Sequence, residues 1–332
     1  MSTSLSSVRI IQTNQFDLCD YLQHLDKAII LIPSFLLSFS IATSAEGNGL
    51  FGQIPAEITL LSELATFAVP NNFIDGPFPA GFGEMANLGF VVVTNNRMSG
   101  SLGEGFLASS PLVAFSASGN DFSGPIPSSF GDFENLAQLL LAENGFSGSI
   151  PASLGNLQNL GTLDLTDNTG LSGSIPDEIY SMSGLENLLL GGCSNIQGIL
   201  SPLVGNLRFL NRLVLGGTRI GGSLPEELFS LPNVSVIDLT NARFSGSLSE
   251  SVGNLAETLR VLKLGGNDFA GPIPVALESL PVLNELELQG NTLTGTISDN
   301  ICGRRGDGRN QLQVLITDCA EVSCTCCTEC GR

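Results

Sequence analysis

Apolar residues recur along most of this chain at a fixed spacing, which is clearest in residues 136–159, LAQLLLAENGFSGSIPASLGNLQN. Leu136, Leu139 and Leu141 give the pattern L-x-x-L-x-L, and Leu160 begins the next copy. Because side chains alternate across a strand, this pattern predicts a short strand with Leu139 and Leu141 on one face. That face is predicted to enter a core, and the intervening residues are predicted to line the opposite face.

The rest of the same unit predicts a turn and a return leg. An Asn amide carries donors and an acceptor, so Asn144 can bind turn backbone that cannot join a sheet. Gly148 permits backbone conformations closed to other residues, and Pro151 fixes φ on the return leg. Such a coil cannot cover its own open faces, so we expect successive coils to stack. Three apolar residues complete the shared interior: Ile150, Leu154 and Leu157.

The period holds along the array. Residues 46–63 are the back half of a repeat without its front half, and an eleventh strand, LQVLITD, begins at Leu312. We therefore predict a leader (1–45), a repeat array (46–311) and a C-terminal strand with a cysteine-rich cap (312–332). Ten complete repeats start 24 or 25 residues apart, at Leu64, Leu88, Leu112, Leu136, Leu160, Leu185, Leu210, Val234, Leu259 and Leu283.

The residue equivalent to Asn144, which we call the turn position, departs from Asn in three consecutive repeats. These carry Cys193, Thr218 and Ala242. Cys and Thr can still donate a hydrogen bond, whereas Ala242 cannot, so a turn group left unpaired there would cost about 1–3 kcal/mol. We therefore expect Ala242→Asn to stabilise the protein. Asn holds the position in the other repeats, at Asn72, Asn96, Asn120, Asn144, Asn168, Asn267 and Asn291.

The motif L-x-x-L-x-L-x-x-N-x-F-S-G-x-I-P-x-x-L-G-x-L, almost intact in residues 136–157, resembles the plant-specific class of leucine-rich repeats. That class includes ectodomains of receptor-like kinases and receptor-like proteins, and polygalacturonase-inhibiting proteins. The resemblance covers about residues 50–320. It implies an α/β leucine-rich repeat solenoid, a right-handed superhelix with a concave parallel β-sheet and convex short helical or 3-10 segments. The G-x-I-P segment commonly adds further β structure beside that sheet.

Both ends of the chain depart from the receptor kinase pattern. No kinase signature precedes Arg332, so we expect no receptor kinase, and the paired-cysteine cap usual before such repeats is absent. Residues 28–45, AIILIPSFLLSFSIATSA, have the length of a signal-peptide core. We favour a cleaved signal, while a retained anchor and a wrongly chosen start or ordered cap stay open. The expected location is secreted or cell-surface, with an anchored or cytoplasmic protein as alternatives.

Charge and composition exclude several function classes. Lys plus Arg number 13 against 32 Asp plus Glu, a net charge of −19, which opposes binding to nucleic acid or an anionic membrane. We expect a monomer, with membrane contact only through an N-terminal anchor. The single histidine, His24, lies outside the repeats, so no Ser-His-Asp or Cys-His arrangement can form in the array. We expect no enzyme, cofactor or resident metal ion.

Six cysteines crowd the C-terminal tail, and they admit a disulfide-stapled cap or a metal-thiolate site. Their even number and the signal-like run favour disulfides, whose connectivity the sequence does not reveal. Asn233 begins an Asn-Val-Ser sequon and is the glycosylation candidate. The tail cysteines are Cys302, Cys319, Cys324, Cys326, Cys327 and Cys330.

The strand residues that face away from the leucine core supply the predicted binding surface. Five of them, Leu140, Leu189, Val214, Val236 and Val261, are predicted to expose apolar side chains, and exposed apolar patches mark interaction sites. The alternative is that such residues are simply good strand formers. The predicted partner-binding residues are Phe90, Val92, Leu140, Asp164, Leu189, Arg212, Val214, Asp238 and Lys263.

Together these patterns predict a non-catalytic protein that binds a protein or peptide through its concave face, in extracellular recognition, signalling or defence. Two alternatives stay open. One is an inhibitor of a secreted glycan hydrolase, and the other is a structural protein that binds cell wall, matrix or ice surfaces.

Overall fold

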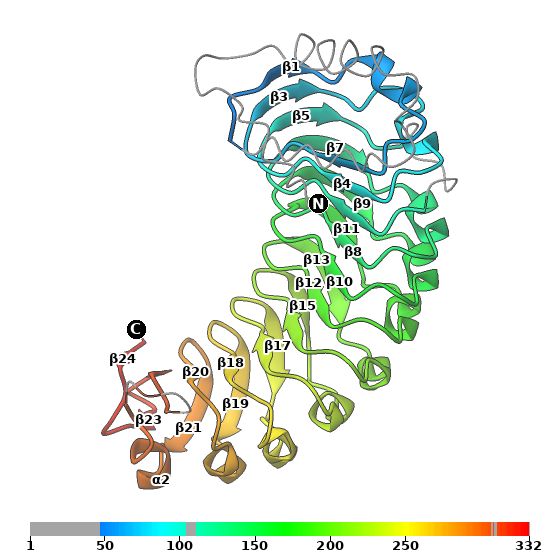
Figure 1. Cartoon of the computed structure of the whole chain (residues 1–332). Helices are drawn as coiled ribbons and strands as arrows, with labels where there is room; N and C mark the ends of the chain where they lie inside the picture. Colours follow the sequence, from blue (N-terminus) through cyan, green and yellow to red (C-terminus); the bar gives the residue numbers. More distant parts are fainter. Residues whose placement is uncertain (1–46, 104–110, 307, 309–310, 332) are drawn as a thin grey trace, which may run out of the picture.

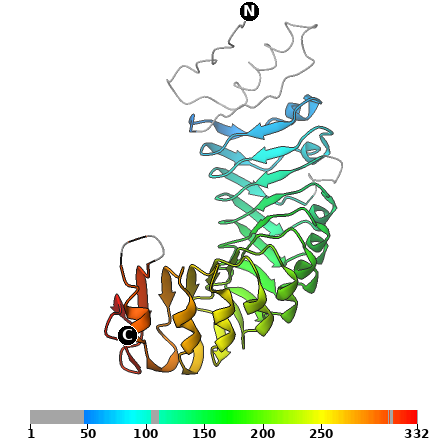
Figure 2. The ribbon, with the colours of Figure 1, turned by 60° about the horizontal axis from the view of Figure 1, so that its bottom comes forward.

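The computed structural model describes residues 47–103, 111–306, 308 and 311–331. The predicted leader, with its apolar run 28–45 and His24, lies outside the described residues. The chain winds into a curved solenoid in which strands line the inner side and short helices the outer side (Figure 1). Viewed after rotation, the coils form stacked layers and the stack bends in its C-terminal half (Figure 2). The predicted solenoid architecture is confirmed.

Two parallel sheets of 12 strands run along the whole stack. Each coil contributes one strand to each sheet, and consecutive coils pair in order. The concave sheet contains β2 (Thr66–Ala68), β4 (Phe90–Val92), β6 (Ala114–Ser116), β8 (Gln138–Leu140), β10 (Thr162–Asp164), β12 (Asn187–Leu189), β14 (Arg212–Val214), β16 (Val236–Asp238), β18 (Val261–Lys263), β20 (Glu285–Glu287), β22 (Val314–Thr317) and β24 (Glu329–Cys330).

The second sheet is built by the segment around the F-S-G-x-I-P motif, as the family resemblance implies. Short 3-10 helices follow it on the convex side, together with the α-helix α2 (Asp299–Cys302) in the described residues. Its strands are β1 (Phe51–Gln53), β3 (Phe73–Gly76), β5 (Arg97–Gly100), β7 (Asp121–Pro125), β9 (Gly145–Ser149), β11 (Gly170–Gly173), β13 (Asn195–Ile199), β15 (Arg219–Gly222), β17 (Arg243–Gly246), β19 (Asp268–Pro272), β21 (Thr292–Thr296) and β23 (Val322–Ser323). The 3-10 helices are η1 (Ala56–Leu60), η2 (Phe82–Glu84), η3 (Ser128–Asp132), η4 (Ala152–Asn156), η5 (Asp177–Ser181), η6 (Pro202–Asn206), η7 (Glu226–Ser230), η8 (Glu250–Leu255) and η9 (Val275–Ser279).

The register of the concave sheet follows the leucine period. Leu163 pairs with Leu139 on one side and with Leu188 on the other, and all three side chains are fully buried. Phenylalanines of the second sheet stack between coils, with ring centroids 6.4 Å apart for Phe122 and Phe146. Each coil therefore buries its open faces against its neighbours, as the repeat pattern predicts.

Asparagines at the turn position connect neighbouring coils. Asn168 is fully buried, and its Nδ2 donates to the carbonyl oxygens of Leu165 in its own coil and of Leu141 in the preceding coil, both at 2.9 Å. Its Oδ1 accepts the backbone N–H of Phe146, also in the preceding coil, at 3.1 Å. One side chain thus satisfies three buried backbone groups on two coils, which explains why the position favours Asn.

Each of the three departures from Asn coincides with a different hydrogen-bond pattern in the turn of the preceding coil. Where the next coil supplies Cys193 or Thr218 in place of Asn, one backbone N–H lacks the side-chain acceptor that Asn provides elsewhere. This N–H instead donates to a carbonyl oxygen in its own coil. Leu171 N donates to Asn168 O at 3.1 Å, and Ile196 N donates to Cys193 O at 3.0 Å. These two turns are one residue longer than the turn from Asn144 to Phe146, so the amide reaches its own backbone.

An Asn at position 242 would find its three possible backbone partners already hydrogen-bonded. The structure therefore gives no reason to expect that Ala242→Asn stabilises the protein. Ile220 N donates to Thr218 Oγ1 at 3.3 Å, and the same hydroxyl donates to Leu215 O at 2.7 Å. The carbonyl oxygen of Leu239 accepts from Asn267 at 2.8 Å. We now predict that Ala242→Asn changes the free energy of unfolding by less than about 0.5 kcal/mol in urea denaturation. A gain above about 1 kcal/mol, the value of a typical added hydrogen bond, would contradict this.

Glycines bring neighbouring 3-10 helices into contact on the convex side. A Cβ at Gly155 in η4 would lie 2.4 Å from the carbonyl oxygen of Glu178 in η5. A Cβ at Gly131 in η3 would lie 2.2 Å from the carbonyl oxygen of Ser153 in η4. These glycines have ordinary φ values, so close approach, and not backbone conformation, requires them.

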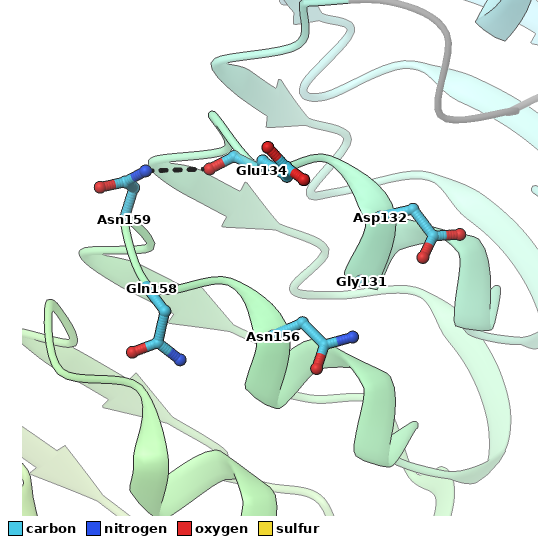
Figure 3. A pocket seen from close by; sticks show the side chains of 6 residues that line it. All are labelled: Gly131, Asp132, Glu134, Asn156, Gln158 and Asn159. Atoms are coloured by element: carbon cyan, nitrogen blue, oxygen red, sulfur yellow. Dashed lines mark hydrogen bonds between the residues drawn. The ribbon is translucent and has the colours of Figure 1, made fainter.

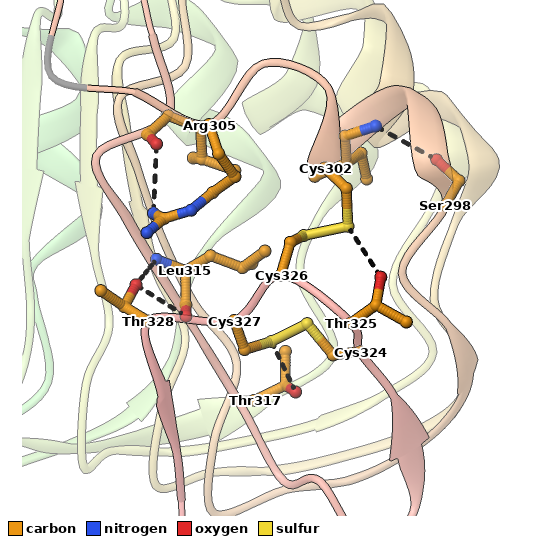
Figure 4. The surroundings of a disulfide bond; sticks show 12 residues. Ser298, Cys302, Arg305, Leu315, Thr317, Cys324, Thr325, Cys326, Cys327 and Thr328 are labelled. Carbon is orange, nitrogen blue, oxygen red and sulfur yellow. Dashed lines mark hydrogen bonds between the residues drawn. A yellow bond between two sulfur atoms is a disulfide. The ribbon is translucent and has the colours of Figure 1, made fainter.

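The C-terminal cap is closed by disulfides, the favoured prediction for the tail. Figure 4 shows two of them, Cys302–Cys326, which ties α2 to the tail, and Cys324–Cys327. Cys319–Cys330 is the third. Thr328 also joins the tail to β22, because its hydroxyl accepts the backbone N–H of Leu315 at 2.6 Å. The three cross-links fix the segment that covers the last coil.

Candidate binding surface on the concave sheet

The nine predicted partner-binding residues all lie on the concave sheet. Phe90 and Arg212 hold the first position of their strands, and the other seven hold the third position. The first and third residues of a three-residue strand point to the same face, away from the buried second residue. Third-position residues of adjacent strands pair directly, as Asp164, Leu189, Val214 and Asp238 do from β10 to β16.

The five apolar residues that were predicted to be exposed on this face are less exposed in the structure. Leu140, Leu189, Val214, Val236 and Val261 are half-buried, because neighbouring strands lie about 4.8 Å apart and their side chains cover one another's flanks. Phe90, at 44 %, is the one large apolar side chain of the concave sheet that is exposed among the described residues. Most exposed large apolar side chains lie elsewhere: Phe51, Leu60, Phe73, Ile199, Leu203, Phe209 and Val275.

The concave face divides into an uncharged and a charged half. From β2 to β8 its first and third positions carry no charged side chain, and Phe90 stands among small and hydroxyl-bearing residues. Thr94, just beyond β4, and Ser116 join their hydroxyls at 2.7 Å across two coils. From β10 onward, carboxylates and two cations appear at these positions.

Lys263 is already paired within the charged half. Its Nζ lies 2.8 Å from Glu285 and 3.0 Å from Glu287 on the adjacent strand β20. Partial burial alone would lower the pKa of Lys263, but the hydrogen bonds and charges of the two glutamates outweigh it and raise the pKa. A ligand would have to compete with these carboxylates, so Lys263 is a weaker candidate contact than the sequence indicates.

Asp164 and Asp238 are oriented by the turns that follow their strands. Asp164 Oδ1 accepts the N–H of Thr166 at 3.1 Å, and Asp238 Oδ1 accepts the N–H of Thr240 at 3.0 Å. Within the described ranges, the second carboxylate oxygen of each has no hydrogen-bond partner. In each half-buried carboxylate, the turn therefore fixes Oδ1, and the second oxygen can accept a hydrogen bond from another donor.

Two glycines lie beside Leu189 and Val214, and side chains of the following coils cover them. Gly191 and Gly216 follow the strands β12 and β14 where Thr166 and Thr240 follow β10 and β16. The side chain of Val214 leans over Gly191, within 3.2 Å of where a Cβ would stand. These glycines were not predicted as part of the surface, although Gly-Gly directly after the L-x-L strand is visible in the sequence, at 191–192 and 216–217 and again at 265–266.

A hollow of about 500 Å³ lies at the ends of η3 and η4, away from the concave sheet. It is polar, and Figure 3 shows side chains from both helix ends around it, with Asn159 donating to the carbonyl oxygen of Glu134 at 2.9 Å. That hydrogen bond connects two coils and has a structural role. The hollow is lined by Gly131, Asp132, Glu134, Asn156, Gln158 and Asn159.

The remaining chemically notable residues have structural surroundings. Cys193, the free cysteine among the described residues, is fully buried and donates to Leu165 O at 3.1 Å. Burial raises the pKa of its thiol to about 11, so it carries little thiolate at neutral pH. No group of three or more metal-ligating side chains occurs in the described part of the chain. Asn233, the predicted glycosylation site, is exposed, and its side-chain nitrogen donates to Arg208 O at 2.8 Å.

Comparison with known proteins finds similar structures among the ectodomains of plant receptors. The Leucine Rich Repeat family matches residues 135–157, and no curated protein matches the chain significantly. The ectodomain of the Arabidopsis receptor kinase HAESA, solved with an IDA peptide hormone, is 33% identical over 78% of this chain and 43% of its own, with a TM-score of 0.71. The plant peptide hormone receptor RGFR1, solved with RGF2, is 30% identical over 77% of this chain and 44% of its own, with a TM-score of 0.69.

A TDR receptor is 25% identical and matches 97% of this chain and 61% of its own, with a TM-score of 0.75. The chain thus spans less than half of HAESA and RGFR1 and under two thirds of the TDR receptor. None of the helices in the described ranges has the length and apolar character that crossing a bilayer requires. The repeat motif, the two parallel sheets and these structural matches together show that the chain is a leucine-rich repeat protein resembling the ectodomains of plant receptor kinases.

Proposed function

We propose that this protein is a non-catalytic, extracellular binding protein that takes an extended peptide, or an extended segment of a protein, on its concave sheet. Two of the similar ectodomains were solved with peptide hormones bound. Three disulfides in the cap support an oxidising compartment, because disulfides persist outside the cytosol.

The observation that carries the proposal is the composition of the concave face. A solvent-facing sheet surface needs no apolar side chains for its own stability, yet Leu140, Leu189 and Val214 stand there half-buried and Phe90 stands exposed. A surface that mixes such residues with charged groups suits a partner that covers it and pairs its polar groups. The curvature also brings many short strands to one side, so a long segment can contact several coils.

Replacing Leu189 and Val214 together with Glu is expected to abolish peptide binding and to leave the fold intact. Both side chains point away from the core, so the change opens no cavity, and it replaces the apolar contacts of the binding surface with carboxylates that an apolar ligand side chain would have to desolvate. The measurement is enrichment of a displayed peptide library on the immobilised protein, with circular dichroism as the check on folding. Affinity for the enriched peptides should fall by at least tenfold, or about 1.4 kcal/mol.

The matched control is Leu203→Glu with Phe209→Glu. Leu203, 41 % exposed, lies in the convex helix η6, and Phe209, 59 % exposed, lies three residues beyond its end, so the same two charges are added outside the concave sheet. Peptide binding should persist in this variant. Equal loss in both variants, or unchanged binding in the concave variant, would show that the ligand does not bind the concave sheet.

A further inference from the structure

Two carboxylates bracket an apolar pair along one column of the concave sheet. Asp164, Leu189, Val214 and Asp238 hold the third position of four consecutive strands, β10 to β16, in direct register. Three strand-to-strand steps of about 4.8 Å place the carboxylate-bearing residues about 14 Å apart. Four residues of an extended peptide span about 13 Å, so an extended chain that crosses these strands places residues four apart over the two carboxylates.

The surroundings fix the side on which such a chain would lie. Gly191 and Gly216 lie two residues beyond Leu189 and Val214, on the side of the column where the strands end. The carboxylate of Asp238 leans to this side and lies over Gly216, since its Oδ1 is 3.1 Å from where a Cβ of Gly216 would stand. Arg212 occupies the first position of β14, on the other side of the column. A cationic ligand is therefore favoured on the glycine side and opposed on the arginine side.

We infer that the ligand of the concave face is an extended peptide with two basic residues four positions apart and an apolar residue midway between them. This inference rests on the proposed function and adds the chemistry of the ligand. Residues two apart in an extended chain share a face, so both basic side chains and the central apolar side chain point to the sheet together. The basic groups meet the carboxylates of Asp164 and Asp238, and the apolar side chain meets Leu189 and Val214.

Charge complementarity at larger scale agrees with this ligand. The chain carries a net charge of −19, so it attracts cationic peptides before contact. Lys263 does not oppose them, because Glu285 and Glu287 neutralise it. Turn amides already hold Oδ1 of each aspartate, so little side-chain freedom is lost when the other oxygen accepts a guanidinium or ammonium donor.

The test selects a displayed library of random dodecapeptides on the full chain and then measures synthetic peptides by fluorescence anisotropy. The enriched sequences should carry two Arg or Lys residues four positions apart around an apolar residue. Asp164→Asn with Asp238→Asn keeps the side-chain oxygens that accept the turn amides, so it preserves the fold, and it should weaken these peptides about tenfold. Asp121→Asn with Asp268→Asn, on the exposed second sheet, is the control and should leave the affinity unchanged.

A spacing series provides the second readout. Capped peptides with two arginines four apart should bind more tightly than the same peptides with arginines three or six apart, and 0.5 M salt should reduce this preference. Two results would overturn this inference and leave the proposed function standing. In both, the enriched peptides lose binding to the variant with Leu189→Glu and Val214→Glu. They then either lack the basic pair or bind the variant with Asp164→Asn and Asp238→Asn as tightly as the unchanged protein. Absence of any peptide that depends on Leu189 and Val214 would overturn the proposed function itself.

Discussion

Gly155→Ala is expected to lower the free energy of unfolding by at least about 3 kcal/mol, the upper range for overpacking a tightly packed site. The new methyl group would meet the carbonyl oxygen of Glu178 at 2.4 Å and its carbonyl carbon at 2.6 Å. These atoms belong to the backbone of the next coil, so no side chain can rotate away. The clash can be relieved only by separating η4 from η5, which opens the packing between two coils.

Gly161→Ala, in the following coil, is the matched control. Its φ is ordinary, and the nearest atom to the new Cβ is Ala137 O at 3.7 Å, a normal contact distance. Alanine there restricts the unfolded chain and should raise stability by about 0.5 kcal/mol. Urea denaturation followed by circular dichroism measures both variants. If Gly155→Ala proves no less stable than Gly161→Ala, the convex contacts do not set the distance between coils.

Asn168→Ala is expected to cost about 3 kcal/mol, the penalty for leaving a buried polar group without a partner. The change orphans the backbone N–H of Phe146, which donates to Asn168 Oδ1 inside the core. The three carbonyl oxygens that lose the amide keep other partners: Leu141 O also accepts from Asn144, Leu165 O from Cys193, and Thr166 O from the N–H of Glu143. The donor in the preceding coil therefore accounts for most of the expected loss.

Asn159→Ala provides the comparison at the surface. Asn159 also connects two coils, through Glu134 O at 2.9 Å, but it is exposed, so water replaces the lost bond at a cost of about 1 kcal/mol or less. Asn168→Asp tests the donor separately, because it keeps the acceptor for Phe146 and removes the NH₂ group that faces three carbonyl oxygens. Equal melting temperatures for the 159 and 168 alanine variants would refute the role assigned to the buried amide.

Most of the fold could be predicted from the sequence because one local rule is repeated. Leu139 and Leu141 must be buried, and the same residues recur 24 or 25 positions later, so the pairing of Leu139, Leu163 and Leu188 follows without knowledge of any distant contact. The second sheet was expected from the family resemblance. The disulfide cap was favoured from the number of cysteines, whereas their pairing depends on three-dimensional proximity that spacing does not encode.

The binding surface was only partly predictable. Strand alternation placed Asp164, Leu189 and Val214 on the concave face, but their exposure depends on side chains contributed by neighbouring coils. The pairing of Lys263 with Glu285 and Glu287 likewise needs the register between β18 and β20. Ala242 illustrates the same limit, because whether an unpaired group exists there is decided by Thr218 and Asn267 in other coils.

Each turn depends on the turn-position side chain of the following coil, and this dependence limits how such arrays can be shortened or recombined. Excising residues 136–159 would bring Asn168 above Phe122, whose amide needs an Asn acceptor and would find one. Excising residues 160–184 would bring Cys193 above Phe146, where sulfur is a poor acceptor. Windings of this protein are therefore interchangeable modules only when the turn of one and the side chain of the next are inherited as a pair.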